Sequence, residues 1–475
     1  MKKLLALTLS LFVCAGCFAG CTGGNDESVT KGKADADDVI VKVWSTEAGA
    51  QAVWEELVEE WNSTTGEEKN IYIDWTTSTD SQKIDVAQQN GQLPNIFNVN
   101  TNQLKKFVLT GDIMPINDLP GGEEFLEDYG QEGLEGSNYK DGKQYSVYMN
   151  VRTAGLIINK DLFKKAGIVD KNGEVKAPKT ISELREAAKK ITNEKEQTYG
   201  YAFPLKFGLT YTTSYPLATS FEETGKENVT KYVDLDKLEV TYPGYKDMFG
   251  WLLDLRDDGS LFPGAETLDN DTARAYFSQG KIGMFPAISW DVGVYTDQFP
   301  AQCDWDVVEF PVLDGHEHTG NYWNQRGGGM VIGSAAATKN PEATMEVYKF
   351  IYSLESRTRL FERGINLSCK TDVLENVDES KVDPRFLKFA KFVNENKRYA
   401  NQESYVSEGE DWKTLFQKVW QNKLTLEQAI KQLEKDDTDG LRRSIEKGTY
   451  SVERQKNVQA YLAGDDNADI TKSDW

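Results

Sequence analysis

Planar polar side chains follow the predicted strands in the first third of this chain. Amide, carboxyl and guanidinium groups can donate or accept hydrogen bonds in fixed directions, which suits recognition of a polar ligand. An arginine fork can bind paired hydroxyl groups or a carboxylate. Asparagine equally suits turns and helix caps, and an arginine can form a salt bridge between domains. These candidates are Thr46 and Glu47 after the first strand, Asn98, Asn100 and Asn102 after the third, and Asn150 and Arg152 farther along.

Histidine chemistry is nearly excluded, because His316 and His318 are the only histidines in the chain. This composition argues against His-dependent hydrolases and most zinc enzymes, whereas catalysis by carboxylates remains open. The His316-Glu317-His318 tripeptide resembles a metal-binding motif, but a charged hairpin tip between Pro311 and Trp323 is the preferred interpretation. We therefore expect neither a metal site nor a cofactor.

The N-terminus resembles the signal of an exported lipoprotein. Met1 to Lys3 form a basic start, and Leu4 to Val13 form an apolar segment too short to span a membrane. Phe18-Ala19-Gly20-Cys21 looks like a bacterial lipobox, which predicts removal of residues 1–20 and lipidation of Cys21. Cys17 is a competing site, and an ordinary signal with incidental cysteines is the other alternative. Residues 21–37 are small and polar, which predicts a flexible lipidated tether to the extracellular face of the membrane.

Chain length and net charge limit the domain organisation and the kinds of partner this protein can have. The 475 residues exceed what one hydrophobic core usually organises, so two units are expected. The chain has 76 acidic and 54 basic residues, and a net charge of −22 disfavours nucleic-acid partners. Cys303 and Cys369, the two cysteines outside the signal region, could form a disulfide or remain as buried thiols. We expect a monomer.

Strand and helix patterns alternate along the body of the chain. β-Branched runs predict strands over 38–44, 70–75 and 94–99, with helices between them, which indicates parallel βαβ units. Trp54, Leu57 and Trp61 recur at helical spacing and predict a core face; Trp251 is also assigned to the core. Extended runs follow at 145–150 and 154–159, Thr180 begins a helix, and the last hundred residues are predicted to be helical without strands.

Six short motifs occur along the body of the chain, at residues 41–44, 91–97, 111–115, 159–167, 178–184 and 277–286. Their order resembles that of the family 1 extracellular solute-binding proteins, the maltose-binding-protein-like sugar receptors of ABC importers. Each motif is weak alone, but their order behind a lipobox is specific. The chain departs from the family in having Asn95 after proline and Trp323-Asn324-Gln325 before the glycine-rich entry to a strand.

The resemblance implies two α/β lobes joined by a hinge, with the ligand between them. We expect one lobe at 38–151 plus 328–368 and the other at 152–327 plus 369–475. The chain would then cross between the lobes near residues 150–152, 326–328 and 366. Ligands of open α/β sheets lie beyond the carboxyl ends of strands, so the loops after Trp44, Phe97 and Tyr148 should face the cleft.

A sugar presents apolar C–H faces and a rim of hydroxyl groups, so a site for it needs aromatic rings beside planar polar groups. The resemblance implies that Trp290 is the aromatic residue of the cleft, and neighbouring Ser289 and Asp291 make full burial of this tryptophan less favourable. Trp412 and Tyr211 match other family ligand positions, although Trp412 also fits a helical core face. The remaining expected site residues are Trp44, Asp291, Trp323, Asn324 and Arg326.

Two classes of function compete. The resemblance implies a receptor that captures an oligosaccharide and delivers it, without altering it, to the permease of an ABC transporter. The alternative is a surface-attached glycoside hydrolase that uses paired carboxylates. Cleavage of oligosaccharides by the purified protein would distinguish them.

Overall fold

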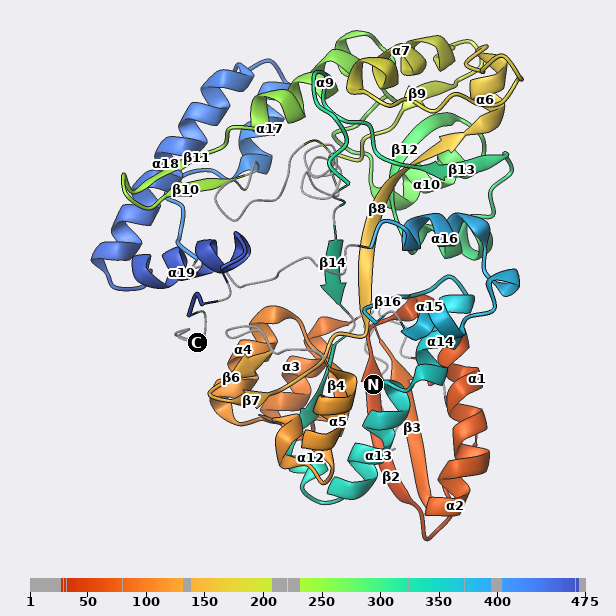
Figure 1. Cartoon of the computed structure of the whole chain (residues 1–475), viewed down its shortest axis with the longest axis vertical. Coiled ribbons are helices and arrows are strands. Elements are labelled where there is room, and N and C mark those ends of the chain that lie inside the picture. Colours follow the sequence, from red (N-terminus) through yellow and green to blue (C-terminus); the bar gives the residue numbers. More distant parts are fainter. Residues whose placement is uncertain are drawn as a thin grey trace, which may run out of the picture.

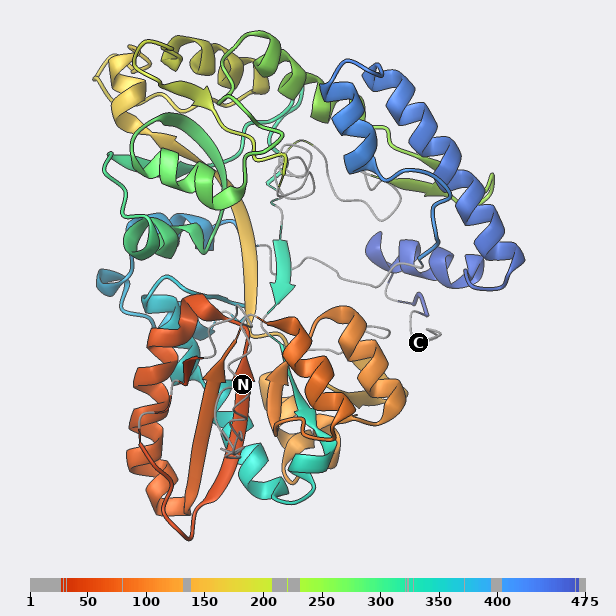
Figure 2. The same cartoon turned by 180° about the vertical axis from the view of Figure 1, so that it is seen from behind.

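The computed structural model describes residues 27–469 apart from residues 29, 31, 79, 131–137, 207–219, 221–230, 321, 323, 328, 371, 394–403 and 466. This part of the chain forms two α/β lobes, and strand β8 (Asn150–Asn159) runs from one lobe into the other (Figure 1). The same arrangement is seen from behind in Figure 2. The two-lobe α/β class predicted from the sequence is therefore the class observed.

The first lobe contains a six-stranded sheet in the order β1-β3-β2-β4-β15-β5. The β2 strand lies parallel to β3 and β4, as the predicted βαβ units require. The β15 strand comes from far downstream in the sequence and pairs antiparallel with β4 and β5, so this lobe is discontinuous in sequence. The strands are β1 (Glu27–Ser28), β2 (Val39–Ser45), β3 (Ile71–Thr77), β4 (Ile96–Asn98), β5 (Ile113–Met114) and β15 (Met330–Gly333).

Helices with buried apolar faces pack around this sheet. Trp54 and Trp61 of α1 (Gln51–Trp61) are buried, and the Trp54 ring stacks on Trp75 of β3 at a centroid distance of 4.4 Å. The predicted core face of this helix is thus confirmed. The other helices of the lobe are α2 (Glu67–Lys69), α3 (Ser81–Gln89), α4 (Thr101–Thr110), α5 (Gly122–Tyr129), α12 (Ser334–Ala337), α13 (Pro341–Ile351) and α14 (Leu354–Glu362), and a short hairpin joins β6 (Tyr139–Lys140) to β7 (Lys143–Gln144).

The second lobe is built on the strand order β13-β8-β12-β9. All residues of β12 (Ile282–Ile288) are buried, as expected for a strand covered on both faces. The outer strands are β9 (Tyr199–Tyr201) and β13 (Trp305–Val308). The helices are α6 (Lys160–Lys165), α7 (Ile181–Ile191), α9 (Tyr245–Asp257), α10 (Asn270–Ser278), α11 (Asp291–Gly293) and α16 (Pro384–Ala390).

The C-terminal helices extend this lobe on the side away from α16 (Figures 1 and 2). They are α17 (Trp412–Trp420), α18 (Leu426–Glu446) and α19 (Val452–Leu462), and the hairpin of β10 (Tyr232–Asp234) and β11 (Glu239–Thr241) packs on α18. In the described part of the last hundred residues the regular elements are helices and no strand occurs, as predicted. Trp251 of α9 is buried in the same core, also as predicted.

Three chain segments meet where the lobes join. The first residues of β8 pair antiparallel with β14 (Asn324–Gly327) and with β16 (Leu367–Ser368), while its later residues pair with β12 and β13. Register places Asn150 opposite Gly327 and Ser368. The short helix α15 (Asp372–Asn376) follows β16. The three segments expected to cross between lobes therefore lie side by side.

The start of the described chain is more ordered than a flexible tether ending at residue 37. The β1 strand pairs with the edge of β3, and the Thr30 hydroxyl accepts the Trp75 N–H at 2.8 Å. Without β1, strand β3 would be an edge strand with unpaired backbone N–H and C=O groups, which explains why β1 pairs with it. The predicted extended run at 145–150 is also only partly a strand, because β8 begins at Asn150.

Two further features bear on the predictions. Cys303 and Cys369 are free thiols, and burial raises the pKa of Cys303 to about 11. In the described part of the chain, none of the helices has the length and apolarity to span a bilayer.

Candidate ligand-binding site

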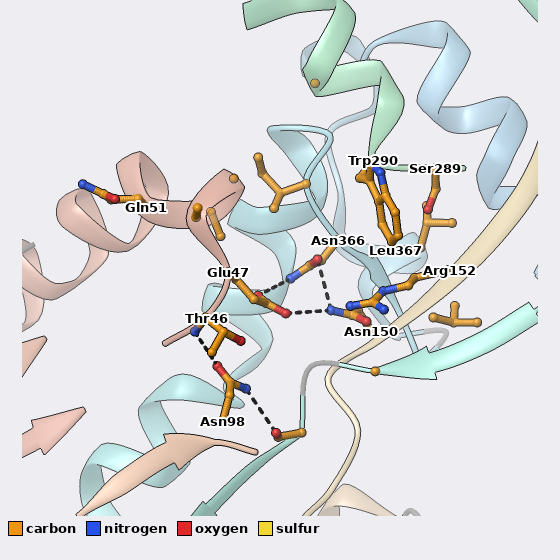
Figure 3. A pocket seen from close by; sticks show the side chains of 18 of the residues that line it. Thr46, Glu47, Gln51, Asn98, Asn150, Arg152, Ser289, Trp290, Asn366 and Leu367 are labelled. Atoms are coloured by element: carbon orange, nitrogen blue, oxygen red, sulfur yellow. Dashed lines mark hydrogen bonds between the residues drawn. The ribbon is translucent and has the colours of Figure 1, made fainter. Parts of the chain in front are cut away.

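A cavity of about 870 Å³ lies where the two lobes and the crossing strands meet (Figure 3). This volume is within the range of small-molecule sites, about 300 to 1,000 Å³. Its walls come from the first strand-to-helix turn, the end of β4, the start of β8, the loop after β12, β14 and the segment before β16. The sequence-predicted residues among its lining are Thr46, Glu47, Asn98, Asn100, Asn150, Arg152, Trp290 and Arg326.

Asn98 fixes the wall contributed by the first lobe. Its side-chain oxygen accepts the Thr46 N–H at 3.0 Å, and its amide nitrogen donates to the Gly329 carbonyl at 3.1 Å. The side chain is 7% exposed, and both of its hydrogen bonds hold neighbouring backbone segments. Asn98 thus positions the first turn of the cavity wall.

Glu47 joins the first lobe to two of the crossing segments. Its carboxylate accepts hydrogen bonds from the amide groups of Asn150, at 3.3 Å, and Asn366, at 3.4 Å. Asn150 also donates to the Asn366 side-chain oxygen at 3.1 Å, which closes the three-residue network seen in Figure 3. The Asn150 side-chain oxygen is buried without a hydrogen-bond partner. This oxygen is an acceptor that a bound hydroxyl group could satisfy.

Trp290 enters the cavity from the second lobe, and Arg152 lies against its ring. The guanidinium carbon of Arg152 is 5.0 Å from the ring centroid, which is a cation–π distance. Figure 3 shows the tryptophan ring directed toward the arginine at the start of β8. The positively charged guanidinium therefore lies against the Trp290 ring.

Asp291 does not line the cavity, in contrast to the expectation from the sequence. The residue is 3% exposed, and its carboxylate accepts the Ile288 N–H at 2.8 Å and the Arg274 guanidinium. Burial raises the pKa of Asp291, and the positive charge of Arg274 opposes this rise. Burial also disfavours the charged form of Arg274, but the neighbouring Asp291, Asp271 and Tyr295 together raise the pKa of the guanidinium. The pair closes the turn that presents Ser289 and Trp290.

The structure places three other predicted residues away from the cavity. Trp44 packs beside α3 with the Lys83 ammonium 4.3 Å from its ring centroid. Asn324 donates to the carbonyls of Tyr322 and Phe392 and holds β14 in place. Trp412 packs against the Tyr245 and Phe249 rings in the second-lobe core, because its helix buries that face.

Asn100 lines the cavity but serves mainly as a helix cap. It forms a reciprocal capping box with Gln103 at the start of α4, which is the alternative that the sequence left open. Tyr211, Trp323 and Cys21 lie outside the described residues, as does the side chain of Asn102. Their predicted roles remain predictions.

Other lining residues were not predicted to bind ligand. Asn366, Ser289, Gln51 and Arg274 also line the cavity. Asn366 was expected at a crossing, and Ser289 is adjacent to Trp290, so their positions in the sequence carried a usable signal. Gln51 at the start of α1 carried no such signal.

Among the described residues, no group of three His, Cys, Asp or Glu side chains could hold a metal ion. His318 instead accepts the Gly320 N–H at 3.0 Å within its own loop. The cavity lining offers hydrogen-bonding groups, one tryptophan ring and the guanidinium groups of Arg152, Arg274 and Arg326.

Two lobes, a hinge of three crossing segments and a polar cavity at the hinge define the class of two-lobe solute-binding proteins. The profile of the bacterial extracellular solute-binding protein family matches residues 56–387. This chain belongs to that family, which confirms the resemblance found in its motifs.

Characterised relatives are binding proteins. The maltotriose-binding protein of Pyrococcus abyssi is 27% identical over 269 residues, which cover 56% of this chain and 52% of the relative. The polygalacturonan/rhamnogalacturonan-binding protein YtcQ of Bacillus subtilis is 27% identical over 305 residues, covering 59% and 56%. The chain thus spans about half the length of the curated relatives it matches.

Solved structures share the fold. The maltose/maltodextrin-binding domain MalE of Bdellovibrio bacteriovorus, bound to maltotriose, superposes with a TM-score of 0.60 at 19% identity. The match covers 86% of this chain and 100% of that domain. At this identity the likeness establishes the two-lobe fold.

Proposed function

We propose that this protein captures an oligosaccharide between its lobes and delivers it, unaltered, to the permease of an ABC transporter. The observation that carries the proposal is the cavity itself, in which Trp290 of one lobe faces Thr46 and Asn98 of the other across the hinge. An aromatic ring and planar amides are the groups that a sugar requires. Relatives that bind maltotriose and polygalacturonan support a saccharide ligand.

The proposal includes an anchored receptor. Lipidation of Cys21 would hold the soluble lobes at the extracellular face of the membrane, with lobe boundaries near residues 151, 327 and 368. Substitution Cys21→Ala should abolish lipid attachment and release the protein from the membrane fraction. Unchanged membrane retention of this variant would contradict the anchor while leaving the binding function intact.

Ligand binding should be tested first by a thermal-shift screen across oligosaccharides. A ligand that binds only the folded protein, at 100 times its dissociation constant, stabilises it by about 2.7 kcal/mol. Calorimetry with the best ligand should then compare Trp290→Ala with the parent protein. Loss of this aromatic surface should weaken binding by about 2 to 4 kcal/mol, as at central residues of other interfaces.

Trp54→Phe is the matched control because Trp54 is a buried core tryptophan outside the cavity lining. It should lower stability and leave affinity nearly unchanged. Small-angle scattering should show compaction on ligand addition in the parent. If Trp290→Ala binds as tightly as the parent and compacts equally, the cleft is not the binding site.

An assay for oligosaccharide cleavage distinguishes a receptor from a glycoside hydrolase. The Glu47 carboxylate is held by two amide groups, as an architectural network would hold it. We expect no oligosaccharide to be cleaved. Enzyme-dependent cleavage by the purified protein would overturn the receptor function.

A further inference from the structure

Arg152 lines the cavity without a carboxylate partner among the described residues, in contrast to two other arginines near the lobe junction. Arg274 pairs with Asp291, and Arg357 pairs with Asp372. Within the described part of the chain, no acidic oxygen lies within 4.0 Å of the Arg152 guanidinium, although the sequence contains 76 acidic residues. An arginine that lines a cavity in so acidic a protein is placed to bind an anion from outside the chain.

Two contacts hold the Arg152 guanidinium in place without satisfying its charge. One is the Trp290 ring, at 5.0 Å from the guanidinium carbon. The other is the backbone of Gly327, where an added Cβ would lie 3.3 Å from that carbon and 3.4 Å from Nη2. The glycine permits this close approach of the planar group. The donors of a positioned guanidinium fork match the two oxygens of a carboxylate.

Three acidic residues line the cavity, namely Glu47, Glu55 and Asp297, and none of them forms an ion pair with Arg152. Glu47 accepts hydrogen bonds from Asn150 and Asn366, which keep its carboxylate within the crossing-strand network. The side chain of Arg326 also lines the cavity and adds positive charge to the same wall. Arg152 and Arg326 thus offer positive charge to a negatively charged group of the ligand.

We propose that the ligand is an acidic oligosaccharide containing uronic acid residues, and that Arg152 binds a uronate carboxylate. This inference rests on the proposed function, since it assumes that the cavity binds an oligosaccharide. Arg152 would then determine specificity by charge, while Trp290 and the amides bind the sugar ring. Both the charge and the planar fork of Arg152 contribute to this selection.

The test uses pairs of glycans that differ only in charge. We would titrate the protein with trigalacturonate and with its methyl ester, and with xylo-oligosaccharides with and without a glucuronate branch. The parent should bind the acidic member of at least one pair about 10- to 100-fold more tightly, as a charge-assisted contact predicts. This preference should decrease as salt rises from about 0.01 to 0.15 M, because mobile ions screen the interaction.

Amino-acid substitutions test whether Arg152 causes the preference for the acidic glycan. Arg152→Gln should remove the preference by weakening binding of the acidic member only, and Arg152→Lys should retain part of it. Gly327→Ala keeps the charge, but the added Cβ would lie 3.1 Å from Asn150 Oδ1 and 3.3 Å from the guanidinium carbon. It should therefore weaken binding of both members of a pair and also reduce the acidic preference, which provides a second measurement if Arg152→Gln is unstable. Arg442→Gln, at an exposed ion pair with Glu239, is the control and should leave the preference unchanged.

The outcomes distinguish this inference from the proposed function. If the parent binds neutral members as tightly as acidic ones, the inference is overturned and the receptor function stands. The same conclusion follows if the acidic preference is undiminished in both Arg152→Gln and Gly327→Ala. Binding of neither member of either pair, in a protein that binds another glycan of the thermal-shift screen, overturns this inference and leaves the receptor function standing. Binding of no glycan in that screen would contradict the receptor function, and this inference with it.

Discussion

The substitution Asp291→Asn separates a positioning carboxylate from a ligand-binding one. Asp291 is 3% exposed and pairs with Arg274, whose side chain is 11% exposed. Breaking a buried pair by neutralising one partner usually costs about 3 to 5 kcal/mol. Arg274 would keep a second, exposed partner in Asp271, so we expect the free energy of unfolding to fall by about 2 to 4 kcal/mol.

Binding should respond differently from stability. The asparagine oxygen can still accept the Ile288 N–H, so the turn carrying Trp290 should persist in Asp291→Asn. Affinity for the best glycan should therefore stay within about threefold of the parent, which is under 1 kcal/mol. Asp291→Ala removes that acceptor as well, and should weaken both stability and binding.

Urea denaturation followed by tryptophan fluorescence, together with calorimetry, measures both effects. Asp271→Asn is the control, because its exposed carboxylate should contribute less than about 1 kcal/mol. The double variant Asp291→Asn with Arg274→Met should recover most of the lost stability, since no buried charge remains unpaired. If Asp291→Asn unfolds like the parent but loses binding, the carboxylate contacts the ligand and the positioning role is refuted.

Two further changes test the surroundings of the cavity. Asn98→Ala should destabilise the protein by about 1 to 3 kcal/mol and weaken glycan binding, because the Thr46 N–H and the Gly329 carbonyl lose their partner. The control Asn90→Ala, at an exposed position, should change the free energy of unfolding by no more than about 0.5 kcal/mol in the same denaturation series. The Arg357 guanidinium lowers the pKa of Asp372, so this pair stabilises the fold above the ordinary aspartate value near 3.8 and loses its effect as pH falls through the lowered pKa. Melting curves between pH 6 and about 2.5 should thus fall less steeply for Asp372→Asn than for the parent; equal slopes would contradict the pair.

Regular elements of this protein could be predicted from local pattern. The helical spacing of Trp54 and Trp61 alone placed both tryptophans in the first-lobe core. The β2 strand and the Thr180 cap of α7 also follow from short-range signals. Trp412 shows the limit of such patterns, because its helix face suits a core and a stacking site equally well. Packing against Tyr245 and Phe249 decides in favour of the core.

The site residues were harder to assign because long-range contacts determine their roles. Asp291 follows Trp290 in sequence, but whether its carboxylate meets a ligand depends on Arg274 of another helix. Likewise, Asn366 becomes part of the site only when β16 pairs with β8, about two hundred residues away in the chain. No periodicity within one segment contains that information.

If the lobes move on ligand binding, as we propose, the same long-range network would respond to that movement. Glu47 belongs to the first lobe, whereas Asn150 and Asn366 belong to segments that cross between lobes. A rotation of the lobes about these segments must therefore change the contacts of Glu47 along with the opening of the cavity. A ligand favours closure only by the contacts that differ between open and closed states. An oligosaccharide held by Trp290 on one side and by the Asn98 wall on the other gains such contacts only when both lobes reach it.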